Sequence, residues 1–81
     1  MKVADYEIPE PVLAKASRWF KRRDDFEKDD IVRFLLTVGR KTNDGSLLAR
    51  TYRTAGALIQ AWKRQGLVAK VPRTRKWQVV R

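Results

Sequence analysis

The longest amphipathic stretch of the chain runs from residue 46 to residue 68. Apolar residues recur there in steps of four and three, which form one stripe along an α-helix. Gly66 follows the last periodic residue, at a position where helices commonly end. The pattern predicts a helix over residues 46–65, with an apolar stripe made of Leu48, Tyr52, Ala55, Ile59 and Trp62.

The opposite face of this predicted helix is basic, has small residues between the charges and contains no acid. Gly56, in the middle of the stretch, costs about 1 kcal/mol relative to alanine and indicates a kink near Thr54. Ser46 is a candidate N-cap. The face opposite the apolar stripe comprises Arg50, Arg53, Thr54, Ala57, Gln60, Ala61 and Arg64.

Two further helices are predicted earlier in the chain. In residues 11–23, Leu13, Ala16 and Phe20 form one apolar line, and Pro11 suits a first helical turn. Residues 30–38 form a shorter helix in which apolar side chains follow the i, i+3, i+4, i+7 rule. Gly39 is the expected stop of this helix, and residues 40–46 read as a turn.

The segments between and before these helices are polar. Asp29 or Asp30 can cap the second helix, and Phe26 is expected either to pack onto that helix as a staple or to lie in a very short strand. Pro9 and Pro11 disfavour helix before them, so residues 1–10 are predicted to be an irregular arm.

After Gly66 the apolar period changes from 3.6 to 2. Residues 67–71 and 77–80 alternate around the polar tip 72–76, which predicts a β-hairpin with a basic tip. Trp62 lies on the apolar stripe and Trp77 alternates with Val79, so both are expected in the core rather than stacked on bases.

The order of elements resembles the winged helix-turn-helix superfamily. The most telling part is IQAWKRQGLV followed by a basic hairpin, because a recognition helix in that superfamily commonly leads through Gly-Leu-Val into the wing. The resemblance implies a mainly α fold with a small β-hairpin, in which residues 11–81 form a single three-helix winged-helix domain.

The charge is large and unevenly distributed. The chain has 81 residues and a net charge of +10. Residues 1–30 hold seven basic and eight acidic side chains, whereas residues 31–81 hold twelve basic side chains and the single acid Asp44. Such asymmetry points to a polyanionic partner.

The composition offers little for catalysis or metal binding. The chain contains no Cys and no His, and no glycine-rich phosphate loop precedes a helix. The acids of residues 24–30 are more typical of helix capping than of a cation site, because the loop lacks a glycine at a sharp turn. We therefore expect a non-enzymatic protein without a metal or cofactor. The first residues contain acids and no apolar run, so they are not expected to be a secretory signal, and a cytoplasmic location is expected.

The resemblance implies double-stranded DNA binding through the third helix in the major groove. Arg, Gln and Thr side chains can read base edges, and other cations can position the protein on phosphates. The expected base-edge residues are Arg50, Arg53, Thr54 and Gln60, and the expected phosphate contacts are Arg40, Lys41, Arg64, Lys70, Arg73, Arg75 and Lys76.

Other functions remain open at this point. A basic three-helix domain with a hairpin can bind structured RNA. Winged helices also serve as protein-interaction modules, and the basic surface would then meet an acidic protein partner. For the DNA-binding function, a transcriptional regulator or a mobile-element accessory protein is expected, either alone, as a homodimer or with a partner protein, and away from membranes.

Overall fold

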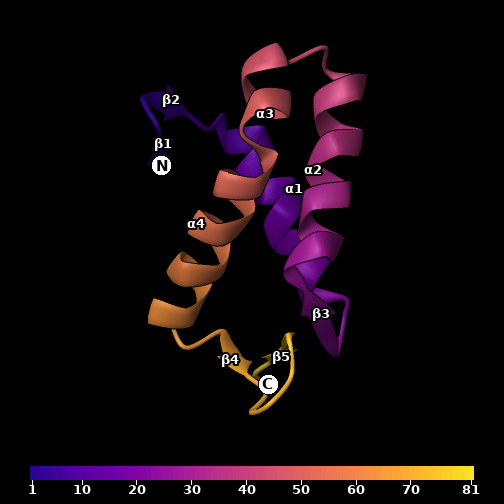
Figure 1. Ribbon diagram of the computed structural model, residues 1–81, viewed down its shortest axis with the longest axis vertical. Helices are drawn as coiled ribbons and strands as arrows, with labels where there is room; N and C mark the ends of the chain where they lie inside the picture. Colours follow the sequence, from indigo (N-terminus) through magenta and orange to yellow (C-terminus); the bar gives the residue numbers. More distant parts are fainter.

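Three long helices and a small three-stranded sheet make up most of the structure, a computed structural model that describes residues 1–81 (Figure 1). The chain is 56% helical, so the predicted mainly α composition with a small hairpin is confirmed. The helices are α1 (Glu10–Lys21), α2 (Lys28–Lys41), α3 (Gly45–Ala49) and α4 (Thr51–Arg64). The strands are β1 (Lys2–Val3), β2 (Tyr6–Glu7), β3 (Asp25–Glu27), β4 (Val68–Lys70) and β5 (Lys76–Val79).

Aromatic side chains join α1, β3 and α4 in the core. The rings of Phe20 and Trp62 stack with their centroids 4.2 Å apart. Phe26 meets both of them edge-on, at 6.5 Å from Phe20 and 6.1 Å from Trp62. Ile31 and Leu35 bring α2 onto this cluster and are fully buried. A small domain depends on such large side chains because much of its surface stays exposed.

The predicted hairpin is confirmed and gains a third strand. β5 lies between β4 and β3, and both pairings are antiparallel. Phe26 pairs with Trp77 across the sheet, which settles its position in a very short strand rather than as a staple. Val68 and Val79 face each other and are buried, so the base of the hairpin is fixed to the core while its tip extends into solvent.

The single helix predicted over residues 46–65 is wrong, because the chain breaks at Arg50 into two helices. The backbone there has φ −125° and ψ 21°, which separates α3 from α4. Gly56 lies inside the uninterrupted helix α4, so the kink expected near Thr54 is absent. The N-cap is Asp44 rather than Ser46, and its carboxylate accepts a hydrogen bond from the Leu47 N–H at 3.0 Å.

The apolar stripe of α4 is also rotated from its predicted position. Tyr52, expected in the core, is 63% exposed, whereas Thr54, expected on the ligand face, is fully buried. The reason is Leu58, which the predicted stripe omits and which is 2% exposed. Burying Leu58 with Ile59 turns the helix so that Thr54, four residues before Leu58, faces inward.

Helix α2 extends beyond residues 30–38 at both ends. It begins after Glu27, whose N–H donates to the Asp30 carboxylate at 2.8 Å, so Asp30 contributes to the cap as expected. Gly39 does not end the helix. A Cβ atom at this position would lie 2.8 Å from Cδ2 of Leu48, so the glycine allows α3 to approach α2 closely.

The first ten residues, predicted to be irregular, instead form a hairpin of β1 and β2. Ala4 and Asp5 adopt φ values of 47° and 64° in its turn, a conformation usually signalled by Asn-Gly or Asp-Gly. The sequence lacks that signal. Val3 and Ile8 are buried, and the Tyr6 hydroxyl donates to the Asp44 carboxylate at 2.5 Å. The hairpin is therefore fixed to the turn between α2 and α3.

Thr54 generates a prediction about stability. Its hydroxyl is buried and has no hydrogen-bond partner. We expect Thr54→Val to raise the free energy of unfolding by about 1 kcal/mol, because it removes an unpaired polar group while keeping the shape. Urea unfolding measures the change, with Thr37→Val on the exposed side of α2 as the control. A loss of stability in Thr54→Val would mean that the hydroxyl does bind a partner.

Asp44 generates a prediction about acid. The hydrogen bonds from the Tyr6 hydroxyl and the Leu47 N–H hold the pKa of Asp44 below its usual value. A lowered pKa stabilises the fold above the unfolded value of about 4, and this stabilisation is lost as the pH falls below it. We expect the stability difference between wild type and Asp44→Asn to shrink on acidification. Urea unfolding across this pH range measures it.

Tyr6→Phe supplies the matching control for this effect. It removes the hydrogen bond from the Tyr6 hydroxyl to the Asp44 carboxylate and leaves the Asp44 cap of α3 in place. The acid loss should therefore be intermediate between wild type and Asp44→Asn. An acid loss identical in all three proteins would contradict the assignment.

Candidate nucleic-acid interface

The outer face of α4 is cationic and free of acids. Helix α4 packs its buried side chains against α1 and α2, so the side that carries Arg53 and Gln60 points away from the core. Lys63 and Arg64 lie on the same exposed side in the last turn. Lys63 is not among the predicted site residues, although its spacing of three residues from Gln60 places it on that face.

The tip of the hairpin adds a second group of cations, all exposed. Its backbone is held by local hydrogen bonds: the Thr74 hydroxyl donates to the Val71 carbonyl at 2.9 Å and accepts from the Lys76 N–H at 3.1 Å. The Nζ atom of Lys76 also lies 4.0 Å from the carboxylate of Asp25, and such an exposed ion pair adds little to stability. The cations of the hairpin are Lys70, Arg73, Arg75 and Lys76.

A hollow of about 420 Å³ links α4 to the hairpin. Tyr52 lines it from the first turn of α4, and Lys70 and Arg75 line it from the hairpin, so the hairpin faces α4 at Tyr52. The Nζ atom of Lys28 lies 3.5 Å from the centroid of the Tyr52 ring, a cation–π contact. The hollow is mixed in charge because Glu27 and Asp29 also line it.

Not all predicted site residues meet on this surface. Arg40 and Lys41 are exposed at the C-terminal end of α2, whereas the sheet adjoins its N-terminal end (Figure 1). A helix of this length separates them by about 20 Å. The structure therefore does not group Arg40 and Lys41 with the hairpin.

Arg50 and Thr54 also differ from their expected positions. Arg50 is half-buried at the break between α3 and α4, where its guanidinium lies 5.7 Å from the Tyr6 ring and donates to the Ser46 carbonyl at 3.2 Å. Thr54 lies in the core and cannot contact a base, because the buried stripe of α4 is rotated toward it.

The three tryptophans differ in exposure. Trp62 is buried against Phe20, as expected. Trp77 is half-buried and has the Lys70 Nζ atom 5.8 Å from its ring centroid. Trp19 is half-buried on α1 and stacks with Phe34 of α2 at 5.6 Å. None of them projects freely from the surface.

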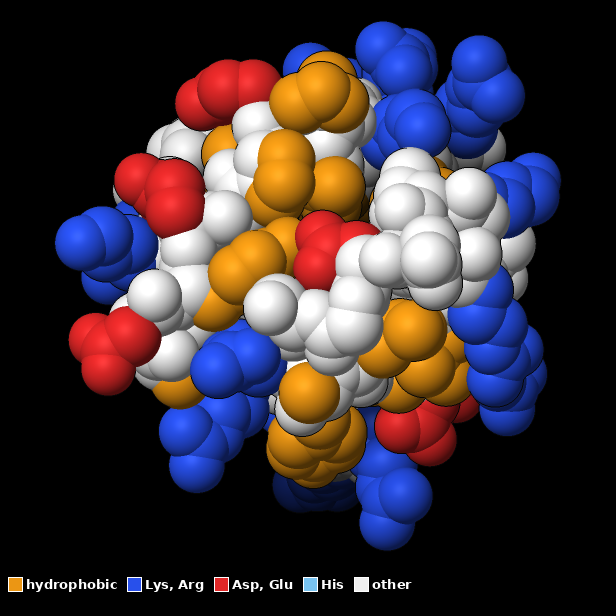
Figure 2. Space-filling view, turned by 90° about the horizontal axis from the view of Figure 1, so that it is seen from above, with side chains coloured by type: hydrophobic (Ala, Val, Ile, Leu, Met, Phe, Trp, Pro, Cys, Tyr) orange, Lys and Arg blue, Asp and Glu red, His pale blue; other side chains and the backbone are white.

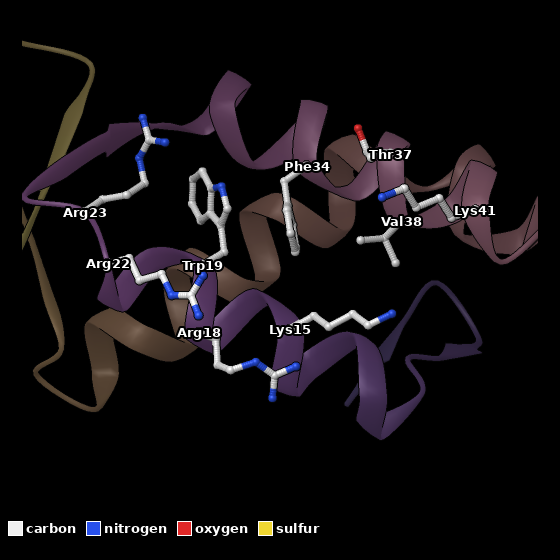
Figure 3. Close-up of a pocket in the computed structure, with 9 residues that line it drawn as sticks. All are labelled: Lys15, Arg18, Trp19, Arg22, Arg23, Phe34, Thr37, Val38 and Lys41. Atoms are coloured by element: carbon white, nitrogen blue, oxygen red, sulfur yellow. The ribbon is translucent and has the colours of Figure 1, made fainter.

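A second cationic surface lies between α1 and α2 (Figure 3). It is a groove of about 530 Å³ with Trp19 and Phe34 inside it. The cations along it are Lys15, Arg18, Arg22, Arg23 and Lys41, and we call the whole the α1–α2 groove. Viewed along the long axis from the α3 end, Lys and Arg are densest on the right of the molecule and also occur at its left and lower edges, with the acidic side chains scattered between them (Figure 2).

The structure groups no three acidic side chains in a way that could hold a metal ion. None of its helices has both the length and the apolar character that crossing a membrane requires.

No protein-family model, curated protein or solved structure matches this chain.

Proposed function

We propose that the chain is a non-enzymatic DNA-binding domain of the winged helix-turn-helix kind. The observation that carries the proposal is the acid-free, exposed outer face of α4 together with a basic, exposed hairpin tip that follows it in the chain. The order α1, β3, α2, α3–α4, β4, β5 and the central position of β5 in the sheet support this architecture. So does the passage from α4 through Gly66 and Leu67 into the hairpin.

Helix α4 has the size and the side chains for the major groove. Its 14 residues extend over about 20 Å, and an α-helix fits the groove of B-DNA. Arg53 and Gln60 are seven residues apart, which places them about 10 Å apart along the helix, or roughly three base pairs. Arg can bind guanine and Gln can bind adenine, each through two hydrogen bonds.

The remaining cations of this surface suit phosphates. Lys63 and Arg64 end α4, and the hairpin carries Arg73 and Arg75 at its exposed tip. Contacts with phosphates fix the protein on the duplex without reading sequence. The interface that we propose leaves out Thr54, Arg40 and Lys41. A role in transcription regulation or as an accessory of a mobile element accords with such a domain.

Salt titration tests the proposal against RNA binding. If about five phosphates are neutralised, the logarithm of affinity for duplex DNA should fall against the logarithm of salt concentration with a slope near −4 to −5. Fluorescence anisotropy with a labelled duplex and a labelled RNA hairpin measures both affinities. Tighter binding to the RNA hairpin at every salt concentration would favour RNA, and no binding to either at low salt would refute the proposal.

Two substitutions separate base reading from positioning. We expect Arg53→Ala to reduce the preference of the protein among duplex sequences, because a bidentate contact to a base is lost and costs about 1–3 kcal/mol. Arg75→Ala should weaken binding to all sequences alike, because a phosphate contact carries no sequence information. Selection from a randomised duplex library followed by affinity measurement distinguishes the two outcomes.

Arg18→Ala is the matched control, since Arg18 is an exposed arginine on α1, in the α1–α2 groove. It should leave duplex affinity close to that of the wild type. Equal losses on every sequence for both Arg53→Ala and Arg75→Ala would contradict the division of roles between α4 and the hairpin.

A further inference from the structure

The α1–α2 groove lies away from the outer face of α4. In a core built from α1, α2 and α4, the groove between two helices is on the side opposite the third. Phe20 of α1 stacks on Trp62 of α4 inside that core, and the outer face of α4 points the other way. A molecule bound in the α1–α2 groove would therefore leave Arg53 and Gln60 accessible.

The rim of the groove is cationic and has no acid among its lining residues. Lys15, Arg18 and Arg22 follow one another on α1 at steps of three and four, so they form one line about 10 Å long. Arg23 and Lys41 stand at the two ends of the groove (Figure 3). Among these cations only Arg23 forms an ion pair, in which its guanidinium lies 3.9 Å from the carboxylate of Asp30. This arrangement favours an acidic occupant.

The interior of the groove is apolar and aromatic. Trp19 and Phe34 are only half-buried although they stack on each other, and Val38 continues the apolar surface along α2. Phe34 and Lys41, seven residues apart on α2, mark a length of about 10 Å, which equals two turns of helix. Trp and Arg are the side chains most enriched where proteins bind one another.

The geometry disfavours a nucleobase in this groove. Phe34 stacks on the Trp19 ring with an interplanar angle of 30°, and the Arg23 guanidinium lies over the same ring at 4.8 Å. Phe26 meets the ring edge-on at 5.6 Å. With side chains already against its faces, Trp19 offers no free face for stacking a base. It can still contact an aliphatic side chain through its exposed edge.

We propose that the α1–α2 groove binds a short acidic amphipathic helix of a partner protein. Apolar anchors on one side of that helix would lie along Trp19, Phe34 and Val38, and its acids would pair with the cations of the rim. This is the helix-in-groove mode of recognition, in which anchors recur at i, i+3 or i+4 and i+7. The proposal does not depend on DNA binding, because it uses the opposite side of the core.

A designed peptide tests this proposal directly. The probe is a labelled peptide of about 15 residues with Leu, Trp and Leu at i, i+3 and i+7 and glutamate at most other positions. A scrambled peptide of the same composition serves as its control. Fluorescence anisotropy should show that the full chain binds the anchored peptide at least tenfold more tightly than the scrambled one. Equal affinities, or no binding of the anchored peptide at millimolar concentration, would overturn the proposal.

Charge reversal locates the binding surface. Arg18→Glu with Lys41→Glu should weaken binding of the anchored peptide at least tenfold, and both side chains are exposed, so the fold should persist. Arg73→Glu with Arg75→Glu makes the same change in net charge on the hairpin and should leave peptide affinity within about twofold. Equal losses in the two double variants would show non-specific attraction and overturn the assignment.

A titration with duplex DNA tests whether the α1–α2 groove is a surface for nucleic acid rather than for a peptide. The groove variant should keep its affinity for duplex DNA, and amide shifts in an NMR titration with the anchored peptide should concentrate on α1 and α2. If duplex DNA instead shifts these amides, and the groove variant loses more duplex affinity than the hairpin variant, the groove is a nucleic-acid surface and the proposal fails.

Discussion

The contact between Phe20, Phe26 and Trp62 is the interaction on which the rest of the structure depends. It joins the end of α1, the short strand β3 and the last turn of α4 at one point. Because β3 also pairs with β5, the same cluster fixes the sheet and the base of the hairpin. The orientation of the hairpin relative to α4 is therefore set by packing in the core.

The high positive charge is compatible with stability partly because of where the cations lie. The last turns of α1, α2 and α4 each carry basic side chains, where they interact favourably with the negative end of the helix dipole. The first turns of α1 and α2 carry acids, which favours the opposite ends. The cations in these last turns therefore stabilise the helices locally, whereas Arg53, in the first turn of α4, and the cations of the hairpin lack this support.

Much of the fold could be predicted from apolar periodicity, and the errors have physical causes. The helices at 11–23 and 30–38 were located but misplaced at their ends, since local signals such as Gly39 are overridden by packing against Leu48. The N-terminal hairpin was missed because its turn uses Ala4 and Asp5 rather than glycine. In the candidate site, Arg53 and Gln60 lie on the expected face. Thr54 is buried and Tyr52 is exposed, the reverse of the prediction, because Leu58 belongs to the core. A stripe read from sequence defines a helix more reliably than it defines the rotation of that helix.

The conformation of Arg73 at the hairpin tip has a consequence of its own. Its φ of 64° is left-handed, a region in which glycine is comfortable and a side chain costs roughly 1–2 kcal/mol. The chain nevertheless has an arginine here, so local backbone strain coexists with a guanidinium in the exposed turn between β4 and β5. A glycine here would relax the turn but remove one of the four cations of the hairpin, so the two properties oppose each other at this one position.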